Sequence, residues 1–293
     1  MTAIGQTIVS GVLLGGIYAL FSLGMTLSWA LLRVINYAMF GFVFLAAYLT
    51  YDLATFRGLD PLVTVLVTVP LGIATMCALQ ALTSVARIDT FGSLIVTFGL
   101  FLVVESGITL VWSNDIVRIP IAQNPYFVKA WHVGAVTVPI LHMLTLACAV
   151  LMCLGSYLLL QRTFTGKAMR ASVQDEEIAA AFGVNSSRLG YLVAGTCGAA
   201  IALAGSAIGM MFVLTPTDSQ GWVPVVFAVV LLGGLGNPVG LLYSSMILAL
   251  IESGIQRFAD PSMAKLAPLL LLVVVVLFRP QGLFRPAVER QVR

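Results

Sequence analysis

Charged side chains are scarce in this chain. Only 9% of its 293 residues are Asp, Glu, Lys or Arg, whereas 60% are hydrophobic. A soluble domain carries about 25% charged residues, so a soluble protein of this composition could not cover its surface. The composition therefore excludes an ordinary soluble domain and indicates a chain surrounded largely by lipid. The net charge of +3 gives no reason to expect a nucleic-acid partner.

Metal-ligating and catalytic residues are equally sparse. The cysteines lie within apolar runs and form no C-x-x-C pair, and the histidines have no partner at ligand spacing. We therefore expect no metal, no disulfide framework and no cofactor. Acidic residues are not clustered as acid–base catalysis would require, which argues against an enzyme. The residues concerned are Cys77, Cys148, Cys153, Cys197, His132 and His142.

What the sequence does contain is a series of long apolar runs. A bilayer core of about 30 Å is crossed by about 20 residues of helix. The first run is longer than the apolar part of a signal peptide and no Lys or Arg precedes it, so we expect an uncleaved span. We predict an all-α polytopic integral membrane protein, one domain over residues 1–293 with about eight or nine transmembrane helices. The predicted spans are residues 8–32, 34–53, 62–84, 91–112, 138–160, 189–214, 223–235, 239–255 and 268–278.

The apolar run of residues 223–255 is too long for one span and contains a glycine- and proline-rich break. Gly233, Gly234, Gly236 and Pro238 form this break, and Asn237 lies beside it. Discontinuous helices of this kind are typical of transporters, where the freed backbone groups must face protein or water. We expect one discontinuous helix here, as two crossings or a re-entrant pair. A second break near residues 36–38 would suit an inverted repeat.

One long polar segment, residues 161–188, interrupts the apolar sequence. We predict a helix over residues 167–182, capped by Thr165 and stopped by Gly183 at its C-terminal end. Residues three or four apart on such a helix share a face. That face would consist of Ala171, Asp175, Ile178 and Phe182. The small, apolar last turn suits insertion into a groove of another protein, although a solvated amphipathic loop helix fits the pattern as well.

Lys and Arg residues lie mostly on one side of the predicted spans. If residues 161–188 are cytoplasmic and the spans alternate, ten basic residues face the cytoplasm and five face out. This agrees with the excess of positive charge in cytoplasmic loops. It places the N-terminus outside and the C-terminus in the cytoplasm, and it makes residues 114–137 an extracytoplasmic loop near the lipid headgroups. The inner set is Arg33, Arg87, Arg162, Lys167, Arg170, Arg188, Arg279, Arg285, Arg290 and Arg293, and the outer set is Arg57, Arg118, Lys129, Arg257 and Lys265.

Four motifs, in order along the chain, carry a family resemblance. They are residues 14–20 and 35–38 near the start, GKAMRASVQDEEIAAAFGVN in the polar segment, LGGLGNPVG at residues 232–240, and RPQGLF at residues 279–284. Together they resemble the permeases of branched-chain amino-acid ABC importers, the inner-membrane subunits of the high-affinity systems, over essentially the whole chain. One departure is Phe40-Gly41, where family members commonly carry His-Gly followed by a polar residue. This departure weakens any inference of this chain's substrate from the substrates of the better-known members.

The resemblance implies a partner for the polar segment. In such importers a cytoplasmic helix docks in a cleft of an ATPase subunit and transmits nucleotide-driven closure to the spans. The only Gly-Lys pair of this chain is followed by Ala168, so the G-x-x-x-x-G-K-[ST] phosphate loop is absent and another protein must hydrolyse ATP. The expected coupling residues are Gly166, Lys167, Arg170, Ala171, Gln174, Asp175, Ala179, Gly183, Val184 and Asn185.

The resemblance also implies further subunits. These are a second homologous permease, two ATP-binding subunits and an extracytoplasmic solute-binding protein, which residues 114–137 could contact as readily as the membrane surface. We expect the chain to be the permease subunit in the bacterial cytoplasmic (inner) membrane, transporting branched-chain or other amino acids. Urea, amides, another small polar solute or, for a sugar-importer permease, a sugar are alternatives. A stand-alone secondary transporter or channel would share the broken helices but would not need a charged docking helix.

Four polar residues are candidates for the translocation path. Glu105 and Glu252 are carboxylates within apolar spans, where ionisable side chains usually face the bundle interior or water. Asn36 and Asn237 lie beside the two breaks. For the two carboxylates, the alternative is a structural role as partners of arginine or of backbone groups.

Overall fold

The computed structural model describes residues 2–86, 89–133, 136–278 and 282–284 of the chain. Within this part, seven helices are long and apolar enough to cross a membrane. These are α1 (Thr2–Leu32), α2 (Ala38–Thr55), α3 (Val65–Val85), α4 (Thr90–Trp112), α6 (Ile140–Arg162), α9 (Ser186–Met211) and α11 (Pro238–Phe258). Two shorter apolar helices are α10 (Val223–Gly233) and α13 (Ala267–Phe278). The prediction of an all-α polytopic fold is confirmed, and the predicted spans correspond to these nine helices.

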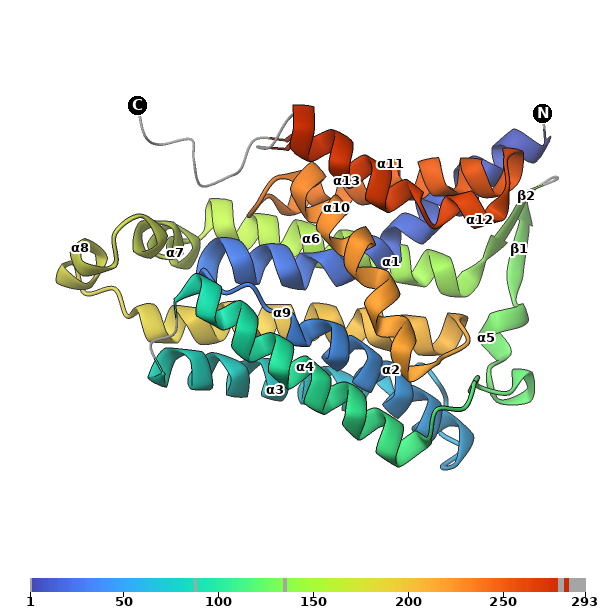
Figure 1. Cartoon of the computed structure of the whole chain (residues 1–293), viewed down its shortest axis with the longest axis horizontal. Coiled ribbons are helices and arrows are strands. Elements are labelled where there is room, and N and C mark those ends of the chain that lie inside the picture. The colour runs from blue at the N-terminus through green and yellow to red at the C-terminus, as the bar shows by residue number, and fades with distance from the viewer. Residues whose placement is uncertain (1, 87–88, 134–135, 279–281, 285–293) are drawn as a thin grey trace.

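The remaining elements lie at the two ends of the bundle. Two short helices, α7 (Phe164–Gln174) and α8 (Glu176–Ala181), project from one end (Figure 1). The opposite end carries the start of α1 and an antiparallel hairpin of β1 (Ala130–Val133) and β2 (Val136–Pro139). We call these the α7–α8 end and the hairpin end. Short elements complete the chain: η1 (Ile121–Gln123), α5 (Pro125–Val128), η2 (Pro216–Trp222) and α12 (Pro261–Ala264).

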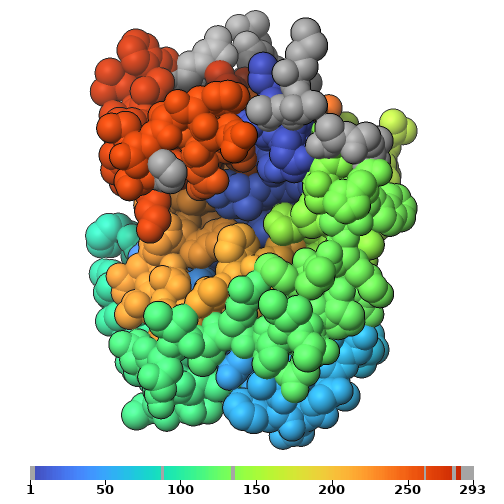
Figure 2. Space-filling view, turned by 90° about the vertical axis from the view of Figure 1, so that its right-hand side faces the viewer, coloured from blue at the N-terminus to red at the C-terminus, as the bar shows by residue number. Residues whose placement is uncertain are grey.

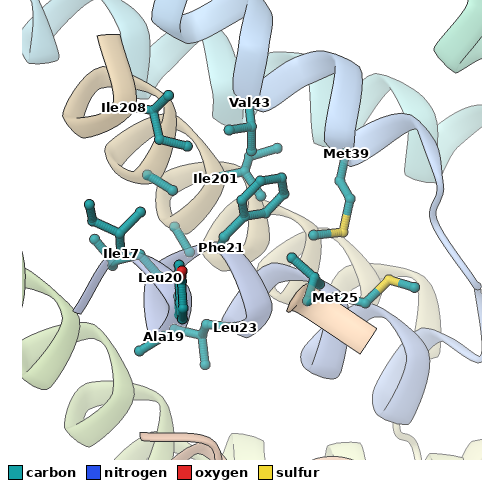
Figure 3. Packing of buried hydrophobic residues seen from close by; sticks show 14 of the residues in the cluster. Ile17, Ala19, Leu20, Phe21, Leu23, Met25, Met39, Val43, Ile201 and Ile208 are labelled. Atoms are coloured by element: carbon teal, nitrogen blue, oxygen red, sulfur yellow. The ribbon is translucent and has the colours of Figure 1, made fainter. Parts of the chain in front are cut away.

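Helix α1 lies at the centre of the bundle and packs against α6, α9, α10 and α11. Its side chains meet those of α2 and α9 in the main core, where Phe21 lies beside Val43 and Ile201 (Figure 3). Helices α3, α4 and α6 instead expose much of their apolar surface, including Leu66 and Leu110. Because contiguous apolar surfaces of this extent are unusual on soluble proteins, these outer faces suit contact with lipid.

Glycines let the central helices approach closely. A Cβ atom on Gly15 would lie 2.9 Å from the Cα atom of Met246 on α11, and one on Gly16 would lie 2.7 Å from the Cα atom of Leu146 on α6. In the same way, a Cβ on Gly198 of α9 would meet the backbone of α3. Small residues at such crossings allow van der Waals packing between helix backbones, which is how helices associate in lipid.

The predicted break separates α10 from α11. Helix α10 has 11 residues, or about 16 Å of helix, and so covers only about half of a bilayer core. Gly234 and Gly236 have φ angles of 79° and 74°, which favour glycine, and Pro238 occupies the first turn of α11. Helix α10 runs obliquely across the long helices (Figure 1). The predicted break is therefore confirmed, and it joins two helices that run in opposite directions, because Gly233 at the end of α10 packs against Leu241 of α11.

The inverted repeat stays a prediction. Helix α1 and helix α10, which precede the two breaks, both run from the hairpin end toward the α7–α8 end (Figure 1). An inverted relation between these two helices would require opposite directions. Any such repeat must therefore pair other elements of the chain.

Candidate functional site

The polar segment forms two short helices rather than the single predicted helix. Thr163, not Thr165, caps α7 by accepting a hydrogen bond from the amide of Gly166 at 3.0 Å. Asp175 then has extended backbone angles and caps α8 by accepting from the amide of Ile178 at 2.9 Å. Aspartate is a strong N-cap, and the acidic residues that follow it favour a helix start. The prediction of one helix over residues 167–182 was therefore wrong, and so was the single face assigned to it.

The end of the polar segment follows the prediction. Gly183 has a φ angle of 82° and stops α8, while the amide of Val184 donates to the carbonyl of Ala179 at 3.1 Å. Asn185 caps the next helix, α9, by accepting from the amide of Arg188 at 3.0 Å. These contacts give Gly183 and Asn185 roles in chain geometry, in agreement with the turn residues that helix ends require.

The predicted coupling residues divide into an exposed set and a structural set. Gly166 is buried, and a Cβ there would lie 2.6 Å from the Cα of Leu160 on α6. Ala179 is also buried, with 4% of its surface exposed. Arg170 is half-buried and donates to the side chain of Gln161 at 3.1 Å. The exposed set is Lys167, Ala171, Gln174, Asp175, Gly183 and Asn185, and Val184 is half-buried.

Two aromatic rings dominate the exposed surface of the α7–α8 end. Phe164 is 83% exposed and Phe182 is 84% exposed, and Ile178 is exposed between them in sequence. Large apolar side chains exposed on a projecting, otherwise polar segment are available for contact with another protein or with lipid. The sequence analysis placed Phe182 on a docking face but overlooked Phe164. The position of Phe164 directly after Thr163, at the start of the polar segment, could have identified it as a second exposed ring.

The four candidate path residues do not form one cluster. Asn36 is 1% exposed at the α1–α2 turn, where its amide lies 3.3 Å from the sulfur atom of Met76 on α3. Its Oδ1 atom is buried and has no hydrogen-bond partner in the part of the chain that the structure describes. Asn237 caps α11 by accepting from the amide of Gly240 at 3.0 Å. Asn36 therefore lies at the turn between α1 and α2, and Asn237 lies at the break between α10 and α11.

The two carboxylates lie nearer the hairpin end and are joined through η2. Gln220 donates to both carboxylate oxygens of Glu105 at 3.3 Å. Trp222 follows two residues later and packs edge-on against the ring of Tyr18, with centroids 5.9 Å apart. The hydroxyl of Tyr18 in turn donates to Glu252 at 2.5 Å. One residue of η2 thus bonds Glu105, and another packs against the tyrosine that bonds Glu252. Among the described residues, neither carboxylate pairs with an arginine.

A polar hollow opens beside Glu252 at the hairpin end. It has a volume of about 340 Å³ and lies between the first turns of α1 and the last turns of α11. Gln256 lines it and donates to Glu252 at 3.4 Å. Figure 2 shows this end of the molecule, with a recess between the blue start of α1, the orange segments and the green loop. The lining residues are Gln6, Thr7, Ser10, Ser253, Gln256 and Arg257.

The loop between α4 and α6 is anchored across the hairpin end. Asn124 donates to the carbonyl of Met210 at 2.9 Å, and the side chain of Gln6 bonds the backbone of Thr137 on β2. The hydroxyl of Tyr126 donates to Asp60 at 2.8 Å, and this hydrogen bond raises the pKa of Tyr126 above its usual value. The described part of the segment predicted as an extracytoplasmic loop thus contains β1 and the start of β2, and this β-hairpin was not expected from the sequence.

A bundle of long apolar helices, with a glycine-rich break between α10 and α11 and a projecting polar segment, defines a polytopic membrane protein of the transporter type. Comparison of the sequence with known families identifies which one. The family described as "branched-chain amino acid transport system / permease component" matches residues 7–276. The chain therefore belongs to this family of transport permeases, and the resemblance seen in its motifs is confirmed.

Individual relatives align with this chain over most of their length. The chain is 26% identical to the high-affinity branched-chain amino acid transport system permease protein BraD of Pseudomonas aeruginosa, over 97% of both chains. It is 23% identical to the permease protein LivH of Escherichia coli, again over 97% of both. It is also 29% identical to the fructose import permease protein FrcC of Rhizobium meliloti, over 76% of this chain and 64% of that protein. No solved structure matches the chain.

Proposed function

We propose that this protein is the transmembrane permease subunit of an ATP-driven importer in the bacterial cytoplasmic membrane. Its cargo would be a branched-chain or another amino acid. The observation that carries the proposal is the α7–α8 segment, a pair of short capped helices that projects beyond the spans and exposes Phe164 and Phe182. A channel or secondary transporter that works alone has no need for such a surface.

Residues 161–188 would dock on an ATPase subunit. An apolar side chain inserted into a cleft, surrounded by charged contacts, is a common way for a short helix to bind a partner. The exposed phenylalanines supply the apolar part, and Lys167, Asp175 and Glu177 supply charge around them. A second permease, two ATP-binding subunits and a solute-binding protein complete the proposed assembly, with the last facing residues 114–137 at the hairpin end.

The proposed orientation places the α7–α8 end in the cytoplasm. It rests on the sequence-wide excess of Arg and Lys assigned to that side. Five basic residues, Arg33, Arg162, Lys167, Arg170 and Arg188, lie at the α7–α8 end, and five lie at the hairpin end. The excess thus depends on Arg87 and on the four arginines after Phe278, which lie outside the described residues.

The translocation path would run beside the broken helix. The break supplies backbone groups at membrane depth, and the polar hollow beside Glu252 supplies an opening at the hairpin end. Ionisable residues within spans usually serve a cavity or a partner, and Glu252 has both within one helical turn. Of the four candidates, Glu252 therefore has the strongest case for contact with the solute.

Uptake into proteoliposomes tests the proposal. The chain would be purified alone and together with ATPase and permease subunits from the same source, and radiolabelled leucine uptake would be measured with and without ATP. We expect uptake only in the complete complex and only with ATP. Transport by the chain alone, without ATP, would contradict the proposal. Competition by unlabelled alanine, urea, acetamide and fructose would then separate the solute classes, with fructose included because of the relative that carries this name.

A further inference from the structure

Arg33 bridges the first span and the polar segment. It follows the last residue of α1 and has a φ angle of 56°, a conformation that few residues other than glycine adopt. Its guanidinium Nη2 atom donates a hydrogen bond to the carbonyl oxygen of Val173. Val173 is the penultimate residue of α7, and the last four carbonyls of a helix have no donor within the helix. Arg33 therefore supplies both a donor and a positive charge to the C-terminus of α7, where both are favourable.

The turn that carries Arg33 is bonded firmly to α4. The amide of Ile35 donates to the hydroxyl of Ser93 at 3.2 Å, and the hydroxyl of Thr97 donates to the carbonyl of Ile35 at 3.0 Å. The amide of Tyr37 also donates to Thr97, at 3.0 Å. A displacement of the Arg33 side chain would therefore be carried by the backbone of this turn to α4 and to the start of α2.

The same end of α1 also holds the break between α10 and α11. The hydroxyl of Thr26, seven residues before Arg33, accepts a buried hydrogen bond from the amide of Gly236 at 3.2 Å. Gly236 lies between α10 and α11, and its amide has no partner within either helix. The last two turns of α1 thus contact α7 through Arg33 and the broken helix through Thr26.

The contact between Arg33 and α7 lies at the edge of a hollow. A space of about 150 Å³ lies here, lined by Arg33, Gln80, Ser172 and Glu176 among others. On its other side α7 is packed tightly, because Gly166 touches the backbone of α6. Helix α7 is therefore packed against α6 and also contacts α1 and α9, and the side chain of Arg33 adds a polar link to it next to free space. This arrangement permits relative movement while keeping the two elements linked.

We propose that Arg33 is a positioning residue that transmits movement of α7 to the α1–α2 turn and to the α10–α11 break. The inference rests on the proposed function, since it requires an ATPase that moves α7. In this scheme Arg33 contacts neither ATP nor solute. It sets how much of the movement of the polar segment reaches the helices that border the path.

The test replaces Arg33 with glycine in the complete reconstituted transporter. Glycine suits the φ angle of 56°, so Arg33→Gly removes the side chain without straining the turn. Arg33→Lys keeps a donor and a positive charge, and Arg57→Gly removes an exposed arginine at the hairpin end as a matched control. ATP hydrolysis, leucine uptake, co-purification of the ATPase subunit and melting temperature would be measured for each variant.

We expect Arg33→Gly to reduce the leucine taken up per ATP hydrolysed by about fivefold or more, as loss of a coupling contact does. ATPase co-purification and melting temperature should stay at the wild-type level. Arg33→Lys should recover part of the ratio, and Arg57→Gly should leave it unchanged. A wild-type ratio in Arg33→Gly would overturn the inference, and so would loss of ATPase co-purification or of the fold, because Arg33 would then act in assembly. If the wild-type complex itself showed no ATP-dependent uptake, the proposed function would be the part that failed.

Discussion

The hydroxyl of Tyr18 donates a 2.5 Å hydrogen bond to the carboxylate of Glu252, which lies 234 residues later in the chain. The bond joins α1 to α11 near the polar hollow of the hairpin end. Tyr18 is buried, and its ring also packs edge-on against Trp222 at the start of α10. One side chain therefore connects the central helix, the broken helix and the acidic residue nearest to the proposed path.

Tyr18→Phe should lower stability and uptake together. Loss of a hydrogen bond to a carboxylate destabilises a protein by about 1.5–3 kcal/mol. Melting in detergent and leucine uptake in proteoliposomes would measure the two effects. Tyr243→Phe is the matched control, because Tyr243 is an exposed tyrosine on α11. A melting temperature unchanged in Tyr18→Phe would show that the bond contributes nothing to the packing of α1 against α11.

Gly198→Ala should separate α3 from α9. The added Cβ would lie 2.7 Å from the Cα of Ile73, and a backbone atom cannot move aside as a flexible side chain can. Overpacking of this kind costs about 1–3 kcal/mol. Gly107→Ala provides the control, because no atom lies within 4 Å of a Cβ built there. Melting temperatures of the two variants should differ by several degrees, and equal values would contradict the close contact.

Gly236→Ala should disturb the break without touching the long helices. A side chain at a φ angle of 74° is strained by about 1–2 kcal/mol, and the amide that donates to Thr26 would shift with it. We expect reduced uptake per ATP with normal insertion into membranes. Gly221→Ala, in η2, has open space around it and serves as the control. Uptake equal to wild type in Gly236→Ala would argue against a role for the break in transport.

Phe182→Ala should weaken binding of the ATPase subunit while leaving the chain stable. The ring is 84% exposed and makes little contact within the chain, whereas truncation of an aromatic residue at an interface centre costs about 2 kcal/mol or more. Co-purification of the ATPase would be compared with that of Phe56→Ala, which removes an exposed ring at the hairpin end. Equal recovery of the ATPase with both variants would contradict docking at α8.

Ala179 is a poor choice for the same experiment. Ala179→Trp would be expected from the sequence to block docking, but the residue is buried within the polar segment. The larger side chain would disrupt α8 itself. Asp175→Arg has a related complication, because it removes the cap that starts α8. Phe182→Ala avoids both effects.

The spans and the break were predictable because their signals are local. A helix that crosses lipid needs a long apolar run, and a break with positive φ angles needs glycine, so both appear directly in the sequence. The split of the polar segment at Asp175 was missed because the alanine-rich stretch after it also favours a continuous helix. In the structure, the N-cap at Asp175 starts a separate helix, and the sequence shows no change of apolar periodicity there that would indicate the split.

The contacts that define the candidate site could not be predicted. Arg33 meets Val173 and Tyr18 meets Glu252 only because α1 lies at the centre of the bundle, and no local pattern reports which span is central. The four proposed path residues shared a property, polarity at membrane depth, but not a location. Which of them lie together depends on the packing of helices that are distant in sequence.

The central position of α1 also bears on how the protein is made. Helix α1 is synthesised before α6, α9, α10 and α11, the helices against which it packs, and all four follow residue 139. Its polar side chains Thr26 and Tyr18 therefore lack their hydrogen-bond partners, Gly236 and Glu252, until the last third of the chain has been synthesised. Chains that end before Gly236 would lack both partners, and incompletely packed chains of this kind are degraded by quality-control proteases.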